Sequence, residues 1–226
     1  MKKGLCACVL VLLAVNGSVW AQTGVRFGFR AGYSMATQYG IDDPTLPYDL
    51  ETSYRHGLAG GFFVYYPITD AFGIQQEFLY VQKGSKQDIT MLEAPVETNT
   101  NYKINYFELP ILFRYSFLRL GKARIYGCTG FALSIMTDGD YRTKGSIEIQ
   151  GMPITFEDSG KIEGVDIFDY AFLYGNGVDF PLFDRECFFE YRFTIGWNSL
   201  MMPTFEGEPP VPLRNQDYIF SLGMYF

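Results

Sequence analysis

The stretch from Asn215 to Phe226 limits the possible folds of this chain more than any other. Its side chains alternate with period two, as they do on an extended strand. One face carries Tyr218, Phe220, Leu222, Met224 and Phe226, and the other carries Asp217, Ile219, Ser221, Gly223 and Tyr225. A soluble domain rarely ends on an apolar strand face. A barrel that meets lipid does so, because its last strand closes against the first and leaves no edge.

Seven earlier segments also read as strands, although the second is rich in glycine and alternates only weakly. The links between them are short in three places and long in four, and the long links hold most of the Pro, Asp, Glu and Asn. We therefore expect residues 22–226 to form an all-β, eight-stranded antiparallel transmembrane up-and-down β-barrel, with short periplasmic turns and long outward loops. The expected strands are 25–35, 56–66, 72–84, 102–117, 122–136, 167–180, 186–199 and 215–226; the short turns are 67–70, 118–121 and 181–184; the long links are 37–55, 85–101, 137–166 and 200–214.

Alternation alone does not say which face of the barrel is buried. A soluble eight-stranded barrel that carries a small ligand would place its aromatic residues inside. Here the polar faces are rich in Gly and Ser, which make room where side chains converge on a narrow axis. The apolar faces hold more aromatic residues than one small cavity could contain, in a chain that is 18% aromatic. We therefore expect the aromatic faces to contact lipid, with several Tyr and Trp residues in the interfacial girdles.

Charged residues on the inward faces are nearly balanced in sign. Because an isolated buried charge costs several kcal/mol, this balance predicts ion pairs inside the barrel. Paired carboxylates can also serve acid–base catalysis, but an eight-stranded lumen is just wide enough to be filled by side chains. We expect internal packing and no general diffusion pore. The inward charges are Arg26, Arg30, Lys83, Arg114, Arg124 and Arg192 against Glu77, Glu108, Asp169, Asp179 and Glu190.

The first residues have the features of an export signal. Lys2 and Lys3 precede an apolar run over 9–15, and Val19–Ala21 resembles a cleavage site. A membrane anchor is the alternative, but the run is too short to span a bilayer. We expect residues 1–21 to be a signal peptide that directs the protein to the cell outer membrane. The chain has a net charge of −7, which cleavage would make more negative, so nucleic acid is not an expected partner.

Two cysteines, Cys128 and Cys187, follow the signal, and an exported protein could pair them. The alternation places them on different strands and opposite faces, which favours free thiols.

One histidine, His56, opens the second expected strand at the outer rim, with Ser53 and Glu51 close in sequence. A lipid-modifying enzyme could use such a group, but no spacing rule supports a catalytic triad. We therefore expect no catalytic site.

The third long link is acidic, and weak calcium binding is one reading of it. Its spacing is not that of a calcium loop, and no Cys/His cluster has metal-ligand spacing. We expect a solvated acidic loop, with no metal and no cofactor. The residues concerned are Asp138, Asp140, Glu157, Asp158, Glu163 and Asp166.

Three stretches resemble the PorT-like outer-membrane β-barrel family of Gram-negative bacteria. They are Phe72–Gly84, Tyr106–Tyr115, and Glu190–Phe193 with Gly196 and Asn198. The resemblance extends over nearly the whole chain after residue 21, and the first two stretches are its most specific part. It implies an outer-membrane barrel, commonly of unassigned function, without a catalytic motif. A role in a protein-secretion apparatus, with which the namesake subgroup is associated, is implied only as an alternative.

Three functional classes follow from these observations: a structural or surface-interaction protein, a secretion component, and a lipid-modifying enzyme. The link 137–166 is long for a mere connection and favours the first class. Within it, 146–150 and 153–156 could form a hairpin that turns through Gly151 and Met152 and offers an edge to a partner; a loop that only covers the barrel mouth is the alternative. The expected partners are outer-membrane lipids, the barrel-assembly machinery during insertion, and a protein at the outward loops.

Overall fold

Ten antiparallel β-strands make up the computed structural model, which describes residues 24–40, 48–91, 96–149, 152–162, 166–198, 200–202 and 211–226. No helix among these residues is long and apolar enough to cross a membrane. The expected signal peptide, residues 1–21, lies outside them. The strands are β1 (Arg26–Tyr39), β2 (Tyr48–Pro67), β3 (Phe72–Met91), β4 (Val96–Leu120), β5 (Ala123–Ile149), β6 (Met152–Lys161), β7 (Phe168–Leu182), β8 (Arg185–Gly196), β9 (Leu200–Met202) and β10 (Val211–Tyr225).

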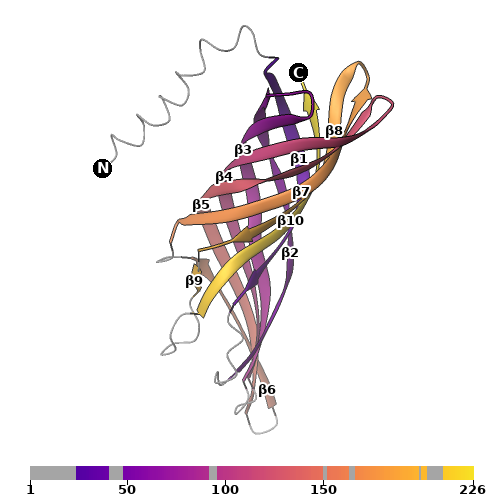
Figure 1. Ribbon diagram of the computed structural model, residues 1–226. Coiled ribbons are helices and arrows are strands. Elements are labelled where there is room, and N and C mark those ends of the chain that lie inside the picture. The colour runs from indigo at the N-terminus through magenta and orange to yellow at the C-terminus, as the bar shows by residue number, and fades with distance from the viewer. Residues whose placement is uncertain are drawn as a thin grey trace, which may run out of the picture.

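Eight of these strands close into a barrel, as the sequence predicts (Figure 1). The wall runs β1-β2-β3-β4-β5-β7-β8-β10, and β10 pairs with β1 from Gly28 opposite Tyr225 to Tyr39 opposite Arg214. The Phe226 amide continues the closure by donating to the carbonyl of Phe27 at 2.8 Å. The two remaining strands add to the wall: β6 pairs with β5, and the short β9 pairs with β10.

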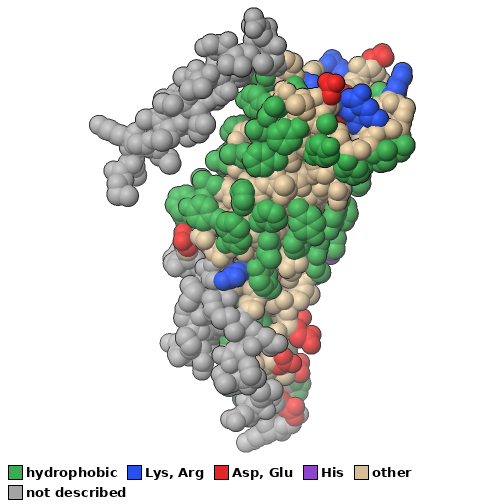
Figure 2. Space-filling view, in the orientation of Figure 1, with side chains coloured by type: hydrophobic (Ala, Val, Ile, Leu, Met, Phe, Trp, Pro, Cys, Tyr) green, Lys and Arg blue, Asp and Glu red, His purple; other side chains and the backbone are tan. Residues whose placement is uncertain are grey.

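The outward face of the barrel is apolar, which confirms the predicted orientation. On the face that Figure 2 shows, hydrophobic side chains gather on the part of the barrel near the short turns, with Lys, Arg, Asp and Glu at the rim beyond them. Large side chains such as Phe62, Ile111, Tyr115 and Leu222 are exposed there. A soluble protein would not leave so large an apolar surface uncovered, so this face suits hydrocarbon.

Four strands extend far past the lengths expected from the sequence. A tilted transmembrane strand needs about 9–11 residues, whereas β5 has 27 and β4 has 25. The links 37–55 and 85–101, predicted as loops, are therefore largely strand, since β2 begins at Tyr48, β3 ends at Met91 and β4 begins at Val96. The prediction missed them because water touches the outer face of these parts, so no aromatic alternation marks them.

These prolonged parts, together with β6, form an open sheet beyond the barrel, here called the extension. It consists of 48–54 of β2, 85–91 of β3, 96–102 of β4, 140–149 of β5, and β6. In Figure 1 it reaches away from the short turns, with β6 at its far end.

Glycines on the inward face make room for aromatic rings. A Cβ atom on Gly28 would lie 2.2 Å from the Phe63 ring, and one on Gly223 would lie 2.2 Å from the Phe188 ring. These distances are far below van der Waals contact, so no other residue fits without repacking. The small inward residues predicted from the sequence thus have a specific purpose.

Candidate functional site: a filled lumen and an outward extension

The middle of the lumen holds two arginines and two glutamates that neutralise one another. Arg30 Nη1 donates to Glu77 at 2.8 Å and to Glu190 at 2.9 Å. Arg192 donates to Glu77 at 2.7 Å and 3.0 Å, and to Glu190 at 2.5 Å. All four side chains are buried. Each carboxylate faces both guanidinium groups, which confirms the predicted internal pairing and offsets the cost of burying charge.

A second buried group lies nearer the extension, around Lys83. Its Nζ is 2.6 Å from Glu108 and 2.9 Å from Asp217. Asp169 lies in the same layer and accepts a hydrogen bond from Asn215 at 2.9 Å. Asp217 is missing from the inward charges counted from the sequence, although the alternation of the last strand places it on the inward face.

Charges and aromatic rings close the short-turn end. Arg114 donates to Asp179 at 2.8 Å and lies 3.6 Å above the Tyr126 ring. Arg26 and Arg124 both bond Glu186, a carboxylate that the sequence reading did not count as inward. Below them, Phe63, Tyr65, Phe188 and Tyr225 form one buried aromatic cluster. Buried side chains therefore occupy the lumen in its middle, nearer the extension and at the short-turn end, as its width predicts.

The structure places His56 on the outward face, beside Tyr33. The two rings stack at 5.6 Å, and Tyr33 Oη lies 2.5 Å from His56 Nδ1. Neither Ser53 nor Glu51 bonds His56 among the described residues. The candidate triad is not assembled, and His56 is part of an exposed aromatic pair where β2 and β3 lose register between Tyr54 and Ala59.

Cys128 and Cys187 are both free and buried. Cys128 points into the lumen near Glu190. Cys187 is buried on the outward face of β8, the face away from the lumen. The prediction of unpaired thiols on opposite faces is confirmed.

The acidic residues of the third long link are spread out, and three of them, Asp138, Asp140 and Glu157, form ion pairs. Lys161 lies 2.8 Å from Asp138 and 2.7 Å from Asp140, and the hydrogen bonds that it donates to both carboxylates raise its pKa. Glu157 bonds Arg142, which lowers the pKa of Glu157. Asp158 accepts a bond from Tyr141, and Asp166 accepts one from the amide of Phe168; Glu163 lies outside the described residues. Within the described chain, no three His, Cys, Asp or Glu side chains are grouped to hold a metal.

Of the two alternatives for the link 137–166, the structure has the hairpin, which is longer than the two short stretches suggested. β5 and β6 pair from Ile149 opposite Met152 to Asp140 opposite Lys161. Met152 therefore lies in β6 and not in a turn, whereas Gly151 lies outside the described residues. One face of this hairpin is apolar and half exposed: Met152 is 65% exposed, Ile154 50% and Phe156 43%. By register this face is the one that continues the barrel interior, because Phe156 lies opposite Gly145, and Gly145 opposite Thr98.

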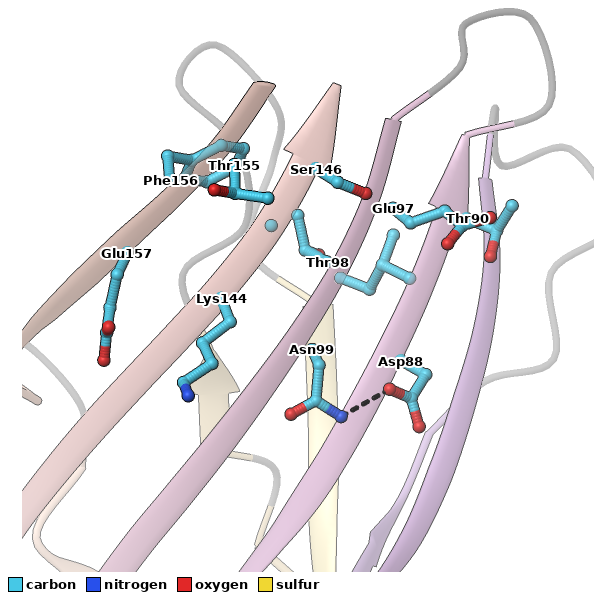
Figure 3. Close-up of a pocket in the computed structure, with 12 residues that line it drawn as sticks. Asp88, Thr90, Glu97, Thr98, Asn99, Lys144, Ser146, Thr155, Phe156 and Glu157 are labelled. Carbon is cyan, nitrogen blue, oxygen red and sulfur yellow. Dashed lines mark hydrogen bonds between the residues drawn. The ribbon is translucent and has the colours of Figure 1, made fainter. Parts of the chain in front are cut away.

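The opposite face of the extension carries a polar hollow of about 750 Å³. Two cross-strand rows of side chains line it, shown in Figure 3 across β3, β4, β5 and β6. A hydrogen bond from Asn99 to Asp88, at 2.5 Å, joins two members of the first row. The first row is Asp88, Asn99, Lys144 and Glu157, and the second is Thr90, Glu97, Ser146 and Thr155. Sequence reasoning missed this site because it depends on strand register.

Comparison with known proteins agrees with this architecture. The OprG outer membrane protein of Pseudomonas aeruginosa has a similar structure, with a TM-score of 0.51 and 12% identity over 90% of this chain and 97% of that one. Neisserial surface protein A gives a TM-score of 0.45 with 14% identity, over 90% of this chain and 99% of that one. At 12% identity, the likeness to OprG concerns the fold alone. No curated protein matches the chain.

The sequence match is to a family rather than to an individual protein. Residues 20–201 match the family described as outer membrane protein beta-barrel domain, which accounts for most of the chain. The closed barrel, its apolar outward face and its filled lumen agree with that match. This protein is therefore an integral outer-membrane β-barrel protein that belongs to the outer membrane protein beta-barrel domain family.

Proposed function

We propose that this protein is a structural or surface-interaction protein of the outer membrane, neither a general pore nor an enzyme, and that its extension binds a protein partner. The observation that carries this proposal is the contrast between the two parts of the molecule. Ion pairs and rings fill the lumen, whereas the extension presents a hollow, a half-exposed apolar strip and a strand edge that no described strand covers. The strand residues beyond those needed to cross a membrane thus form a surface that is suited to binding a partner.

The filled lumen argues against solute passage. A diffusing solute would have to displace the ion pairs of Arg30 and Arg192 and then the aromatic cluster around Phe188. Breaking a buried ion pair costs about 3–5 kcal/mol, so a permanent aqueous path is unfavourable.

The experiment that tests the proposal is site-specific photocrosslinking in intact cells. A photoreactive amino acid replaces Ser146, inside the hollow, and in a second strain it replaces Ile111, on the lipid-facing wall. We expect a reproducible protein adduct from Ser146 alone, and loss of that partner from the membrane fraction when 145–157 are deleted. Equal adducts from both positions, or none from Ser146, would refute the proposal.

The resemblance to PorT-like proteins supports a second candidate, a component of a protein-secretion apparatus. The residues that carry the resemblance include Glu77, Glu108, Arg114 and Arg192, whose partners lie in the lumen. These residues explain a barrel interior similar to that of PorT-like proteins. They give no information about a partner protein. The identity of the Ser146 adduct separates the two candidates, since a secretion component would identify the second.

An enzyme built around His56 has the least support. The described partner of His56 is Tyr33, and no carboxylate in the described part of the chain completes a relay. Unchanged lipid composition of cells that carry His56→Ala supports the non-enzymatic proposal, and loss of a lipid product in that variant would contradict it.

A further inference from the structure

The edge of β6 that faces away from β5 is available for pairing with another strand. Among the described residues, β6 pairs with β5 alone. Its neighbour along the barrel wall, β7, begins at Phe168 and pairs with β5 only from Arg124 to Ile135. Beside β6, therefore, no described strand continues the wall.

Pro153 shows which backbone groups face this edge. Proline has no N–H, so within a sheet it lies at edge positions whose N–H would face away from the ladder. In an antiparallel pair, residues alternate between those bonded to the neighbour and those that point away. By this alternation Thr155, Glu157 and Ser159 also turn their N–H and C=O groups toward the open edge. A ladder of backbone donors and acceptors that no described strand pairs with thus runs along β6.

The side chains of β6 specify what could pair with this ladder. Met152, Ile154 and Phe156 lie on one face, and each is at least 43% exposed. Asp158 follows on the same face; it accepts a bond from Tyr141 and has no cationic partner in the described part of the chain. Thr155 and Glu157 occupy the other, polar face.

We propose that β6 binds an extended polypeptide segment by antiparallel strand addition. The segment has a basic residue followed by apolar residues at three alternate positions. The basic residue lies opposite Asp158, and the apolar residues lie opposite Phe156, Ile154 and Met152. Antiparallel pairing is favoured because its ladder is the more stable per residue. Backbone bonds supply affinity and the alternation supplies selectivity. The inference rests on the proposed function and specifies how its partner binds.

The test uses the full chain refolded in detergent micelles and a synthetic probe, the fluorescent peptide Lys-Thr-Val-Thr-Val-Thr-Val. Its control has the same composition in the order Val-Val-Val-Thr-Thr-Thr-Lys, which lacks the alternation. By fluorescence anisotropy we expect the alternating peptide to bind at least about tenfold more tightly, a difference of about 1.4 kcal/mol. Equal binding of the two peptides, or no binding of the first, would overturn the inference.

Two variants of one residue separate strand addition from other contacts. Thr155→Pro removes an edge N–H while leaving the bonds to β5, as Pro153 already does two residues earlier. Thr155→Val changes the same side chain and keeps the donor. We expect at least about tenfold weaker binding for Thr155→Pro and wild-type binding for Thr155→Val, with unchanged amide-exchange protection in 141–149 of both. Wild-type binding by Thr155→Pro would refute strand addition.

Failure of this inference is distinguishable from failure of the proposed function. If the Ser146 adduct persists in cells that carry Thr155→Pro, the extension binds its partner by other means and only strand addition is refuted. If the Ser146 adduct is absent from wild-type cells, the proposed function itself is refuted.

Discussion

Replacement of Arg192 by methionine tests the lumen most directly. Arg192 is fully buried and bonds two glutamates, Glu77 and Glu190, through three hydrogen bonds of 2.5–3.0 Å. Methionine keeps much of the side-chain volume and adapts to irregular spaces. The change therefore removes a charge without opening a large cavity.

The contacts of Arg192 determine how much the free energy of unfolding should fall in Arg192→Met. Without Arg192, Arg30 is the one remaining ion-pair partner of the two carboxylates among the described residues, and it lies 2.8 Å and 2.9 Å from them. Removing one partner of a buried pair costs about 3–5 kcal/mol because a charge is left uncompensated. Since Arg30 still contacts both carboxylates, we expect the lower end, about 3 kcal/mol.

The double variant Arg192→Met/Glu190→Gln supplies the matched comparison. It leaves one arginine and one glutamate, Arg30 and Glu77, so the middle of the lumen is neutral again. We expect its cost to be at least about 1 kcal/mol smaller than the sum of the two single costs. Arg124→Met, at the partly exposed short-turn rim, should cost about 1 kcal/mol or less.

Urea titration in micelles would measure these free energies of unfolding. Trp197 provides the signal, because it is the only tryptophan after residue 20 and lies exposed on the outward face. A loss below about 0.5 kcal/mol for Arg192→Met, or strict additivity in the double variant, would refute the reasoning. Either result would mean that water, rather than ion pairing, stabilises the lumen charges.

Three further predictions concern closure, packing and thiols. Deleting Phe226, whose amide bonds Phe27, should lower the folded fraction in the outer membrane, measured by heat-modifiable gel migration; an unchanged folded yield would contradict its role in strand closure and in recognition by the assembly machinery. Gly223→Leu should destabilise the barrel by about 1–3 kcal/mol through overpacking against Phe188, measured by urea titration, and a neutral result would contradict the observed contact. Cys128 and Cys187 should resist maleimide in the folded protein and react after unfolding, and rapid labelling of the folded form would contradict their burial.

The sequence predicts the barrel well because lipid imposes a simple rule on strands. Each residue of a membrane strand faces either hydrocarbon or the lumen, so the alternation from Tyr218 to Phe226 reports orientation directly. Eight wall strands, three short turns and the inward charges all follow from this rule. The hairpin in 137–166 is also signalled, by two short apolar stretches around Gly151.

The sequence does not predict the extension, and the physical reason is the opposite one. Beyond the membrane, water reaches the outer face, and residues such as Thr98, Asn99 and Lys144 satisfy strand geometry without an aromatic alternation. The long strands were therefore predicted as loops. Their Thr content is compatible with strand, but this signal is weaker than the Pro, Asp and Asn that suggest loops.

The sequence by itself determined the class of the protein, its membrane-facing surface and most of the charges in its lumen, because these depend on period two along each strand. Only the tertiary structure decided which charges meet. Arg192 contacts Glu77, 115 positions earlier in the chain, because barrel closure and register bring β8 across the lumen from β3. The same register aligned the rows of the hollow and left the outer edge of β6 without a described neighbour. Pairings between distant strands are set by closure of the whole sheet, and no local pattern contains them.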